Sequence, residues 1–252
     1  MYFVIGSEGF LGQAISSSLK AHGHQVRTCD IAGSPDFKID VINNFIELQK
    51  IFQKDPPTYV INLAAFSNGN ACNQNPSKVY ALNVRFVKLL AYICNSVKVK
   101  CLFHASSEWI YGKGPVYQND PSDATLFYHR DHDLYSKSKL DSELQLQDYI
   151  EASKSSLCTK IAIYRFGIIY GSANYFSNCI VDKLLNAWNE NIQMTMNAPT
   201  ASRSFVSLDD IIDLFINSPF VSNVLLGDSD LKVFNIQGPS SYPLFGISDY
   251  IN

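Results

Sequence analysis

The stretch that decides the fold is Gly6-Ser7-Glu8-Gly9-Phe10-Leu11-Gly12, which directly follows the apolar run Tyr2-Phe3-Val4-Ile5. The apolar run predicts a buried strand, and apolar residues at helical spacing after the turn predict a helix. Glycines at such a turn let the backbone approach a phosphate, and the helix N-terminus then points its N–H groups at the anion. The turn therefore predicts a pyrophosphate site, with expected contacts at Gly6, Gly9, Phe10, Leu11 and Gly12.

A carboxylate follows this turn at the spacing of a dinucleotide site. Residues 25–30 read as a second strand, which Asp30 ends about 20 residues beyond the turn. An acid there accepts hydrogen bonds from the adenosine ribose and repels a 2′-phosphate, which favours NAD over NADP. Arg27 lies nearby in the sequence and keeps NADP open as an alternative.

Both signals also have a plainer interpretation. The spacing G-x-x-G-x-x-G differs from the more common G-x-G-x-x-G, and such a turn can join a strand to a helix without any ligand. Asp30 can likewise be an ordinary exposed aspartate.

Strands and helices alternate along the first two thirds of the chain. Further strands are expected at residues 59–63, 101–105 and 160–166, and helices at residues 43–54, 76–94 and 134–150. The alternation predicts an α/β fold of the Rossmann type, with a doubly wound, mostly parallel sheet. Residues 1–170 are expected to form this dinucleotide-binding domain.

The pattern loosens after Gly171. Helices are expected at residues 175–188 and 209–217, a strand at residues 233–236, and the start of another helix near Leu244. Residues 171–252 are therefore expected to form a small substrate lobe that is interleaved with the main domain.

A second chemical signal lies downstream. Tyr135 and Lys139 are four residues apart in a predicted helix, so both side chains lie on one face. A nearby ammonium stabilises tyrosinate, which is expected to lower the tyrosine pKa toward the range of a general acid or base. Ser107, at the end of a predicted strand, can hydrogen-bond a substrate oxygen. The alternative for the tyrosine–lysine pair is a solvated helix face.

The composition excludes several classes of protein. The 252 residues carry a net charge of -3 without a lysine- or arginine-rich run, so no nucleic-acid partner is expected. No stretch reaches the roughly 20 apolar residues of a membrane helix, and the N-terminus lacks the basic start of a signal peptide. Six scattered cysteines without a C-x-x-C pair suit reduced thiols, so a cytoplasmic location is expected.

One polar stretch offers metal-binding side chains. His129 and His132 lie beside Asp131 and Asp133. No further histidine or cysteine ligand stands out, so an exposed loop is favoured and no metal is expected.

Beyond the glycine turn, six stretches in order resemble the extended short-chain dehydrogenase/reductase family of sugar-nucleotide epimerases, dehydratases and reductases. They are spread over most of the chain, and together they are far more specific than any one of them. They are Asn62-Leu63-Ala64-Ala65, Asn83, Ser106-Ser107-Glu108-Trp109-Ile110-Tyr111-Gly112, Tyr135-Ser136-Lys137-Ser138-Lys139-Leu140-Asp141-Ser142-Glu143, Arg165-Phe166-Gly167-Ile168-Ile169-Tyr170-Gly171 and Arg203-Ser204-Phe205-Val206-Ser207-Leu208-Asp209-Asp210.

The resemblance implies a role for each matching residue. Tyr135 would be the acid/base, Lys139 would tune it and hold the nicotinamide ribose, and Ser107 would orient the substrate hydroxyl. Arg203 would contact the diphosphate of a nucleotide-sugar, with a surface ion pair as the equal alternative. Glu108 would lie at the substrate. Further cofactor contacts would be Asp40, Val41, Leu63, Ala64 and Ala65.

The subclass rests on one stretch. Dehydratases of the family carry two acids where this chain has Glu108 and Trp109, which disfavours dehydration. The pattern is most similar to that of the dTDP-4-dehydrorhamnose reductase-like enzymes, which indicates a 4-keto-sugar reductase. A nucleotide-sugar 4-epimerase stays open, as does a non-catalytic NAD(P)-binding regulatory subunit.

Some features depart from the family pattern. Ser136 replaces a usual glycine and Gly167 a usual asparagine. The chain also ends soon after residue 236, so either the substrate lobe is expected to be abbreviated or the chain is expected to be a fragment. The resemblance also implies a homodimer through the helices at residues 76–94 and 134–150.

Overall fold

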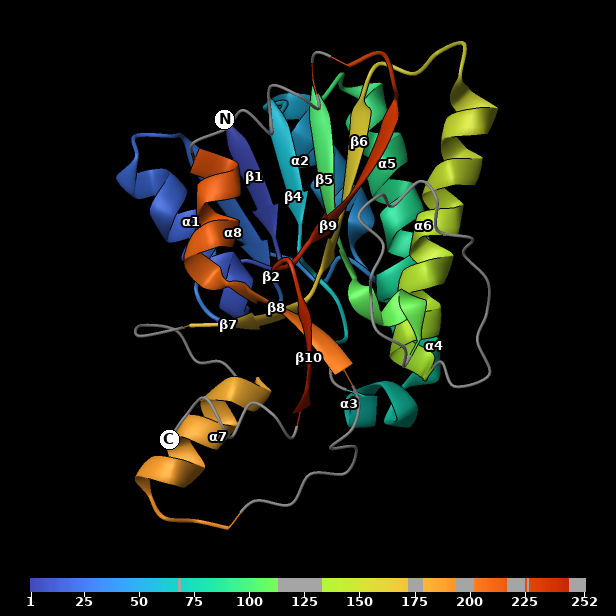
Figure 1. The fold of residues 1–252 in the computed structure, drawn as a ribbon. Coiled ribbons are helices and arrows are strands. Elements are labelled where there is room, and N and C mark those ends of the chain that lie inside the picture. The colour runs from blue at the N-terminus through green and yellow to red at the C-terminus, as the bar shows by residue number, and fades with distance from the viewer. Residues whose placement is uncertain are drawn as a thin grey trace.

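The computed structural model describes residues 1–67, 69–112, 133–171, 179–193, 202–216, 225 and 227–244. Its main sheet has the strand order β3-β2-β1-β4-β5-β6-β9 with parallel neighbours throughout (Figure 1). The strand order reverses between β1 and β4, so the predicted doubly wound Rossmann-type fold is confirmed. The strands are β1 Tyr2–Ile5, β2 Val26–Asp30, β3 Phe37–Lys38, β4 Tyr59–Asn62, β5 Cys101–Ser107, β6 Lys160–Phe166 and β9 Leu231–Ile236.

Helices cover both faces of this sheet. The main ones are α1 Phe10–Ala21, α2 Phe45–Lys54, α5 Phe86–Ser96, α6 Leu134–Ser153 and α8 Leu208–Ile216. Helices α1 and α8 pack together on one face, whereas α2, α5 and α6 pack on the other (Figure 1). Among the described residues, no helix is both long enough and apolar enough to cross a membrane.

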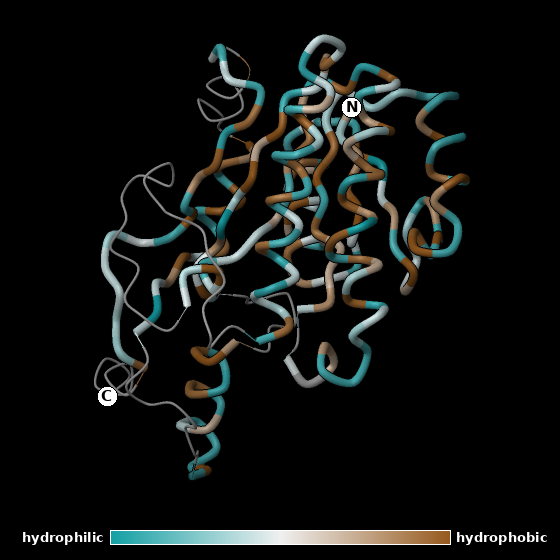
Figure 2. Tube along the Cα trace, turned by 90° about the vertical axis from the view of Figure 1, so that its right-hand side faces the viewer, coloured by the Kyte–Doolittle hydropathy of each residue, from teal (hydrophilic) through white to brown (hydrophobic). Residues whose placement is uncertain are grey.

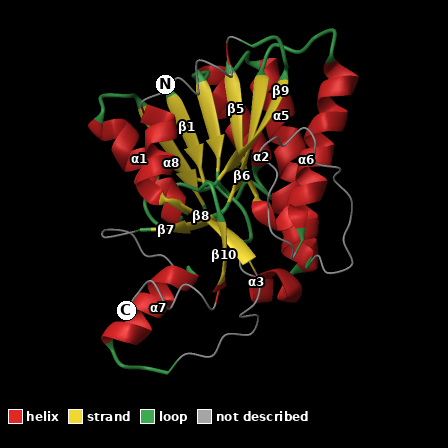
Figure 3. Cartoon of the chain, in the orientation of Figure 1, coloured by secondary structure: helices red, strands yellow, loops and turns green. Residues whose placement is uncertain are grey.

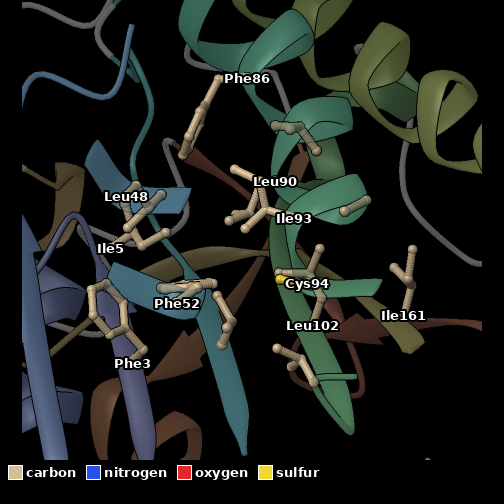
Figure 4. Packing of buried hydrophobic residues seen from close by; sticks show 14 of the residues in the cluster. Phe3, Ile5, Leu48, Phe52, Phe86, Leu90, Ile93, Cys94, Leu102 and Ile161 are labelled. Carbon is tan, nitrogen blue, oxygen red and sulfur yellow. The ribbon is translucent and has the colours of Figure 1, made fainter. Parts of the chain in front are cut away.

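The central strands bury side chains on both faces, because helices lie on each side. In β1, Phe3 and Ile5 join the cluster that α2 and α5 cover, while Tyr2 and Val4 join the cluster beneath α1 and α8. Figure 4 shows the first cluster, where helix residues such as Leu90 meet the sheet. Figure 2 shows hydrophobic stretches along these central strands. Such two-sided burial explains why the strands read as continuous apolar runs.

The helix expected at residues 76–94 contains an irregular turn. It begins as α4 Pro76–Tyr80, passes through the π-helical segment Ala81–Arg85 and continues as α5. The π turn carries Asn83, whose buried side chain reaches the loop after β4. The irregularity therefore lies where a polar side chain connects the helix to the end of a strand.

The C-terminal part of the chain contributes to two sheets. A small sheet of order β10-β8-β7 consists of β7 Ile168–Tyr170, β8 Ser202–Ser207 and β10 Ser241–Pro243. Meanwhile β9 pairs with β6 and α8 packs on α1. The carboxyl ends of the main strands point toward the small sheet and toward α3 Gly69–Gln74 (Figure 3).

The described C-terminal helices overlap the helices that the sequence predicts. They are α8 and α7 Ile180–Asn189, which overlap the helices expected at residues 209–217 and 175–188. The strand expected at residues 233–236 is part of β9. The helix expected from Leu244 onward falls outside the described residues.

Candidate active site

The glycine turn brings three pieces of backbone into close contact. Gly6 has a φ of +82°, and a Cβ built on it would lie 2.6 Å from the backbone N of Ala64. A Cβ on Gly12 would lie 2.1 Å from the carbonyl oxygen of Gly6. Glycine is therefore required at both positions. Helix α1 begins after Gly9 without a side-chain cap, as suits a helix N-terminus that binds an anion.

We expect Gly6→Ala to destabilise the protein far more than Gly23→Ala. Both glycines have a φ near +80°, but the Cβ at Gly23 meets nothing within 4 Å. The left-handed conformation costs about 1–2 kcal/mol in either variant. Overpacking against Ala64 adds roughly 1–3 kcal/mol for Gly6→Ala only. Urea unfolding of both variants measures the difference, and equal losses would contradict the packing argument.

Asp30 is held at the end of β2 by backbone N–H groups. Its Oδ2 accepts from the N–H of Glu8 at 2.9 Å, and its Oδ1 accepts from those of Ile31 at 2.7 Å and Ala32 at 3.1 Å. The carboxylate therefore links the glycine turn to the loop after β2. The guanidinium of Arg27 is instead paired with another acid, since its Nη2 lies 2.8 Å from Asp55 Oδ2, and Arg27 does not line the cavity at Asp30.

Two adjoining cavities lie at the carboxyl ends of the strands. The first has a volume of about 560 Å³ and the second of about 680 Å³, and both are lined by Gly6, Gly9, Leu63 and Ala65. Of the residues predicted at the cofactor, Asp30, Asp40, Val41 and Ala64 line the first cavity. The second cavity is lined by Phe10, Leu11, Gly12, Ser107, Tyr135 and Lys139. The structure thus brings the two distant motifs together.

Tyr135, Ser107 and Lys139 meet in the second cavity. The Tyr135 hydroxyl is hydrogen-bonded to Ser107, and the Lys139 Nζ lies 6.0 Å from the centre of the Tyr135 ring. Lys139 Nζ also donates to the carbonyl oxygen of Ala105 at 2.7 Å, which fixes it beneath the end of β5. Burial lowers the pKa of Lys139 to about 8, against the opposing effect of Glu143.

The expected lowering of the tyrosine pKa is wrong for this arrangement. Burial raises the pKa of Tyr135 to about 12, and the hydrogen bond from Ser107 only partly offsets this. The neighbouring Cys72 and Asp133 raise the pKa further. Burial is the largest cause of this shift, because it disfavours the charged tyrosinate. At neutral pH Tyr135 therefore carries its proton and is ready to act as an acid.

A buried hydrogen-bond chain supports Lys139 from the sheet. Burial keeps the pKa of His104 well below its usual value, so the ring is neutral. Its Nδ1 accepts from Asn62 Nδ2 at 3.2 Å, and its Nε2 donates to Ser142 Oγ at 3.1 Å. Ser142 then donates to the backbone carbonyl of Lys139 at 2.7 Å. The chain fixes this turn of α6 against β4 and β5.

A buried ion pair connects two of the motifs. Glu143 accepts from Arg165 Nη2 at 2.7 Å, and the two side chains are 0% and 2% exposed. Glu143 also accepts from Ser106 Oγ, while Arg165 Nη1 donates to the Tyr111 hydroxyl at 2.5 Å. Tyr111 donates in turn to Asn235 on β9 at 2.9 Å. This pair therefore ties α6 to β5, β6 and β9 directly behind the site.

Asn83 connects the loop after β4 to α6. Its side chain accepts from the N–H of Phe66 at 2.9 Å and donates to the Phe66 carbonyl oxygen at 3.0 Å. It also donates to Ser138 Oγ at 2.9 Å, one residue before Lys139. Asn83 therefore holds together the two segments that line the cavities.

The two predicted substrate contacts lie behind the second cavity and line neither cavity. Glu108 is buried, and its Oε2 accepts from the N–H of Ser204 at 3.2 Å. The Arg203 guanidinium lies 4.8 Å from the centre of the Trp109 ring and donates to the Ser202 carbonyl oxygen at 2.7 Å. Only Trp109 of this group lines the second cavity. Substrate contacts by Glu108 and Arg203 stay predictions.

We expect Glu108→Gln to stabilise the protein at pH 8 but not at pH 4. Burial raises the pKa of Glu108 to about 7, with Ser204 and Arg203 opposing the shift. The folded state therefore holds its proton more tightly than the unfolded chain, so wild-type stability falls as pH rises toward 7. Glutamine avoids this loss, which is on the order of 3 kcal/mol for a rise of the pKa from 4.5 to about 7. Urea unfolding at both pH values measures it, and a pH-independent difference would contradict the assignment.

Both departures from the family pattern have a structural reason. Gly167 lines the second cavity, and a Cβ on it would lie 2.7 Å from the carbonyl oxygen of Ser204, so asparagine does not fit there. Ser136 helps to begin α6, because its N–H and its hydroxyl both donate to Asp133 Oδ1 at 2.8 Å.

Sequence reasoning missed several residues of the site. Asp133 and Cys179 line the second cavity, and Cys72 lies close enough to affect both Tyr135 and Lys139. The aspartate directly before the helix was a recognisable capping signal, whereas the cysteines carry none. His129, Asp131 and His132 lie outside the described residues. Within the described ranges, no group of three or more metal-binding side chains occurs.

Comparisons with known proteins identify similar sequences and a similar fold. A family model described as the NAD dependent epimerase/dehydratase family matches residues 2–217. dTDP-D-glucose 4,6-dehydratase of Dictyostelium discoideum is 24% identical over an alignment 200 residues long, gaps included, which covers 75% of this chain and 45% of that protein. UDP-glucuronate 4-epimerase 3 of Arabidopsis thaliana is 27% identical over an alignment 276 residues long, gaps included, which covers 96% of this chain and 61% of that protein.

A solved structure shows the same fold. MoeE5 in complex with UDP-glucuronic acid and NAD superposes with a TM-score of 0.80 at 19% identity, covering 99% of this chain and 80% of that one. By contrast, the chain spans only about half to three fifths of the length of the two curated relatives, 45% and 61%.

Proposed function

Because the chain belongs to the NAD dependent epimerase/dehydratase family, we propose that it is an NAD-dependent oxidoreductase of a nucleotide-linked sugar. The observation that carries the proposal is the meeting of Ser107, Tyr135 and Lys139 in a cavity that the glycine turn also lines. A glycine turn that only joined β1 to α1 would not need these three side chains in the cavity beside it.

The residues of the two cavities fit NAD. The uncapped N-terminus of α1 suits the pyrophosphate, and the Asp30 carboxylate suits the adenosine ribose. Asp40 and Val41 would lie at the adenine, and Lys139 would hold the nicotinamide ribose. Residues 1–170 would bind the cofactor, with β9 and α8 from the C-terminal part completing that domain.

The proposed mechanism assigns the proton to Tyr135. When bound, NAD supplies a hydride acceptor or donor at its nicotinamide ring. The Tyr135 hydroxyl would give a proton to the oxygen of the reacting sugar carbon in the reducing direction, and its tyrosinate form would take the proton from that oxygen in the oxidising direction. Ser107, already hydrogen-bonded to Tyr135, would orient that oxygen. The ammonium of Lys139 and the charge of the oxidised nicotinamide would favour tyrosinate when a proton must be removed.

A 4-epimerase and a reductase are the two candidate activities. The similarity to a UDP-glucuronate 4-epimerase over 96% of the chain favours the epimerase. The pair Glu108 and Trp109 favours a 4-keto-sugar reductase, since it resembles the reductase pattern. Arg203, stacked on Trp109, would contact the diphosphate of the substrate after a small rearrangement.

Product analysis distinguishes these activities. The protein is incubated with UDP-glucuronic acid, UDP-glucose or a 4-keto-nucleotide-sugar, and products are identified by NMR. An epimerase interconverts two sugars with no net consumption of coenzyme, whereas a reductase consumes one NADH or NADPH for each keto-sugar. Conversion of none of these substrates, with NAD bound, would favour the regulatory subunit instead.

A homodimer through α5 and α6 is part of the proposal. Leu89 and Tyr92 on α5 are exposed at 39% and 59%, as suits a face that a second copy covers. Sedimentation equilibrium measures the mass directly.

A further inference from the structure

Besides Asp30 and Asp40, the first cavity contains a third carboxylate that the family pattern does not explain. Glu8, from the glycine turn, lines this cavity together with Asp30, Ile31 and Ala32. A Cβ built on Gly33 would lie 2.0 Å from Glu8 Oε2 and 2.5 Å from its Cδ. The glutamate side chain therefore lies across the loop after β2, in the space that a side chain at position 33 would otherwise fill.

The backbone of Glu8 is fixed on both sides. Its N–H donates to Asp30 Oδ2 at 2.9 Å, and its carbonyl oxygen accepts from Gln13 Nε2 at 2.8 Å. On the other side of the contact, Gly33 has a φ of +62°, a conformation that favours glycine. Both the space and the conformation at position 33 thus suit the glutamate side chain.

The charges near Glu8 are few among the described residues. Two lysines lie at this part of the molecule: Lys78 lines the first cavity, and Lys38 Nζ donates to the carbonyl oxygen of Gly33 at 3.4 Å, in the loop that the Glu8 side chain contacts. Arg27 is bound by Asp55 instead. Within the described ranges Glu8 has no ion pair. Its carboxylate therefore opposes the attraction that Lys38 would exert on an anion.

We propose that Glu8 is a specificity-determining residue that excludes cofactors carrying a 2′-phosphate. It does so from the glycine turn, in addition to Asp30 at the end of β2. The inference rests on the proposed NAD site, because it assigns the adenosine ribose to Asp30. A phosphate on that ribose would meet two carboxylates and no free space at Gly33, whereas the unmodified ribose of NAD needs only the oxygen atoms of Asp30.

Calorimetric titration with NAD⁺ and NADP⁺ tests this inference without any turnover. The proteins are the wild type, Glu8→Gln and the matched control Glu151→Gln, which removes an exposed charge from the C-terminal part of α6. We expect Glu8→Gln to bind NADP⁺ about tenfold more tightly than the wild type does, because one repulsive charge is removed beside Lys38. Its affinity for NAD⁺, and both affinities of Glu151→Gln, should not change.

Three results would overturn the inference, and they have different meanings. An unchanged NADP⁺ affinity in Glu8→Gln, with NAD⁺ bound normally, would show that Glu8 does not discriminate between the two cofactors. An equal loss of both affinities would show that the side chain only supports the turn. If the wild type bound neither dinucleotide, the proposed function itself would fail, and the inference with it.

Discussion

Tyr135→Phe is expected to lower turnover of the nucleotide-sugar by about 10²–10⁴-fold, the usual contribution of a positioned acid or base. Phenylalanine keeps the ring that lies 6.0 Å from Lys139 Nζ but removes the hydroxyl that bonds Ser107. The affinity for NAD should not change, because the glycine turn and Asp30 are untouched. Steady-state kinetics and calorimetry measure the two quantities separately.

A matched variant separates chemistry from folding. Tyr92→Phe makes the same change on α5, where Tyr92 is 59% exposed and lines neither cavity. It should keep wild-type turnover. Wild-type turnover in Tyr135→Phe would show that the tyrosine is not the acid/base, and a loss of NAD binding in that variant would show that it acts through structure.

Glu143→Gln is expected to destabilise the protein by about 3–5 kcal/mol, because it leaves the buried guanidinium of Arg165 without a counter-charge. Glutamine has nearly the same size, so no cavity forms and Ser106 keeps an oxygen acceptor. Urea unfolding at neutral pH measures the loss. The turn of α6 that carries Lys139 should loosen with it, because the pair holds this helix against β6.

An exposed ion pair is the control for this prediction. Arg27 and Asp55 form an equally short contact of 2.8 Å, but their side chains are 46% and 50% exposed. Asp55→Asn is therefore expected to cost only about 0–1 kcal/mol. Similar losses in the two variants would contradict the claim that burial makes Glu143 important.

The parts of the site that local chemistry defines could be predicted from the sequence. The glycine turn needs Gly6 and Gly12 for backbone contacts, and Tyr135 and Lys139 share a helix face because of their spacing. Each signal lies within a few residues, where turn chemistry and helical periodicity apply. Ser107 was found in the same way, because it follows a recognisable strand.

The remaining features depend on long-range packing, which spacing does not reveal. The chain from Asn62 through His104 to Ser142 joins residues that are 42 and 38 positions apart. The direction of the Tyr135 pKa shift was mispredicted for the same reason, since it depends on burial rather than on the nearest cation in sequence. The loose pattern after Gly171 likewise gave no sign that β9 completes the main sheet.

The measurement that tests the central claim most directly follows the near-ultraviolet absorbance of the reduced nicotinamide. Protein loaded with NAD is mixed with UDP-glucuronic acid or UDP-glucose, which MoeE5 and related structures contain, and the same is done with Tyr135→Phe. We predict that the absorbance rises with the wild type and not with Tyr135→Phe, at equal NAD occupancy. An equal rise in both proteins would contradict the account. So would bound NAD⁺ that neither sugar reduces, if in addition the 4-keto-nucleotide-sugar does not oxidise bound NADH.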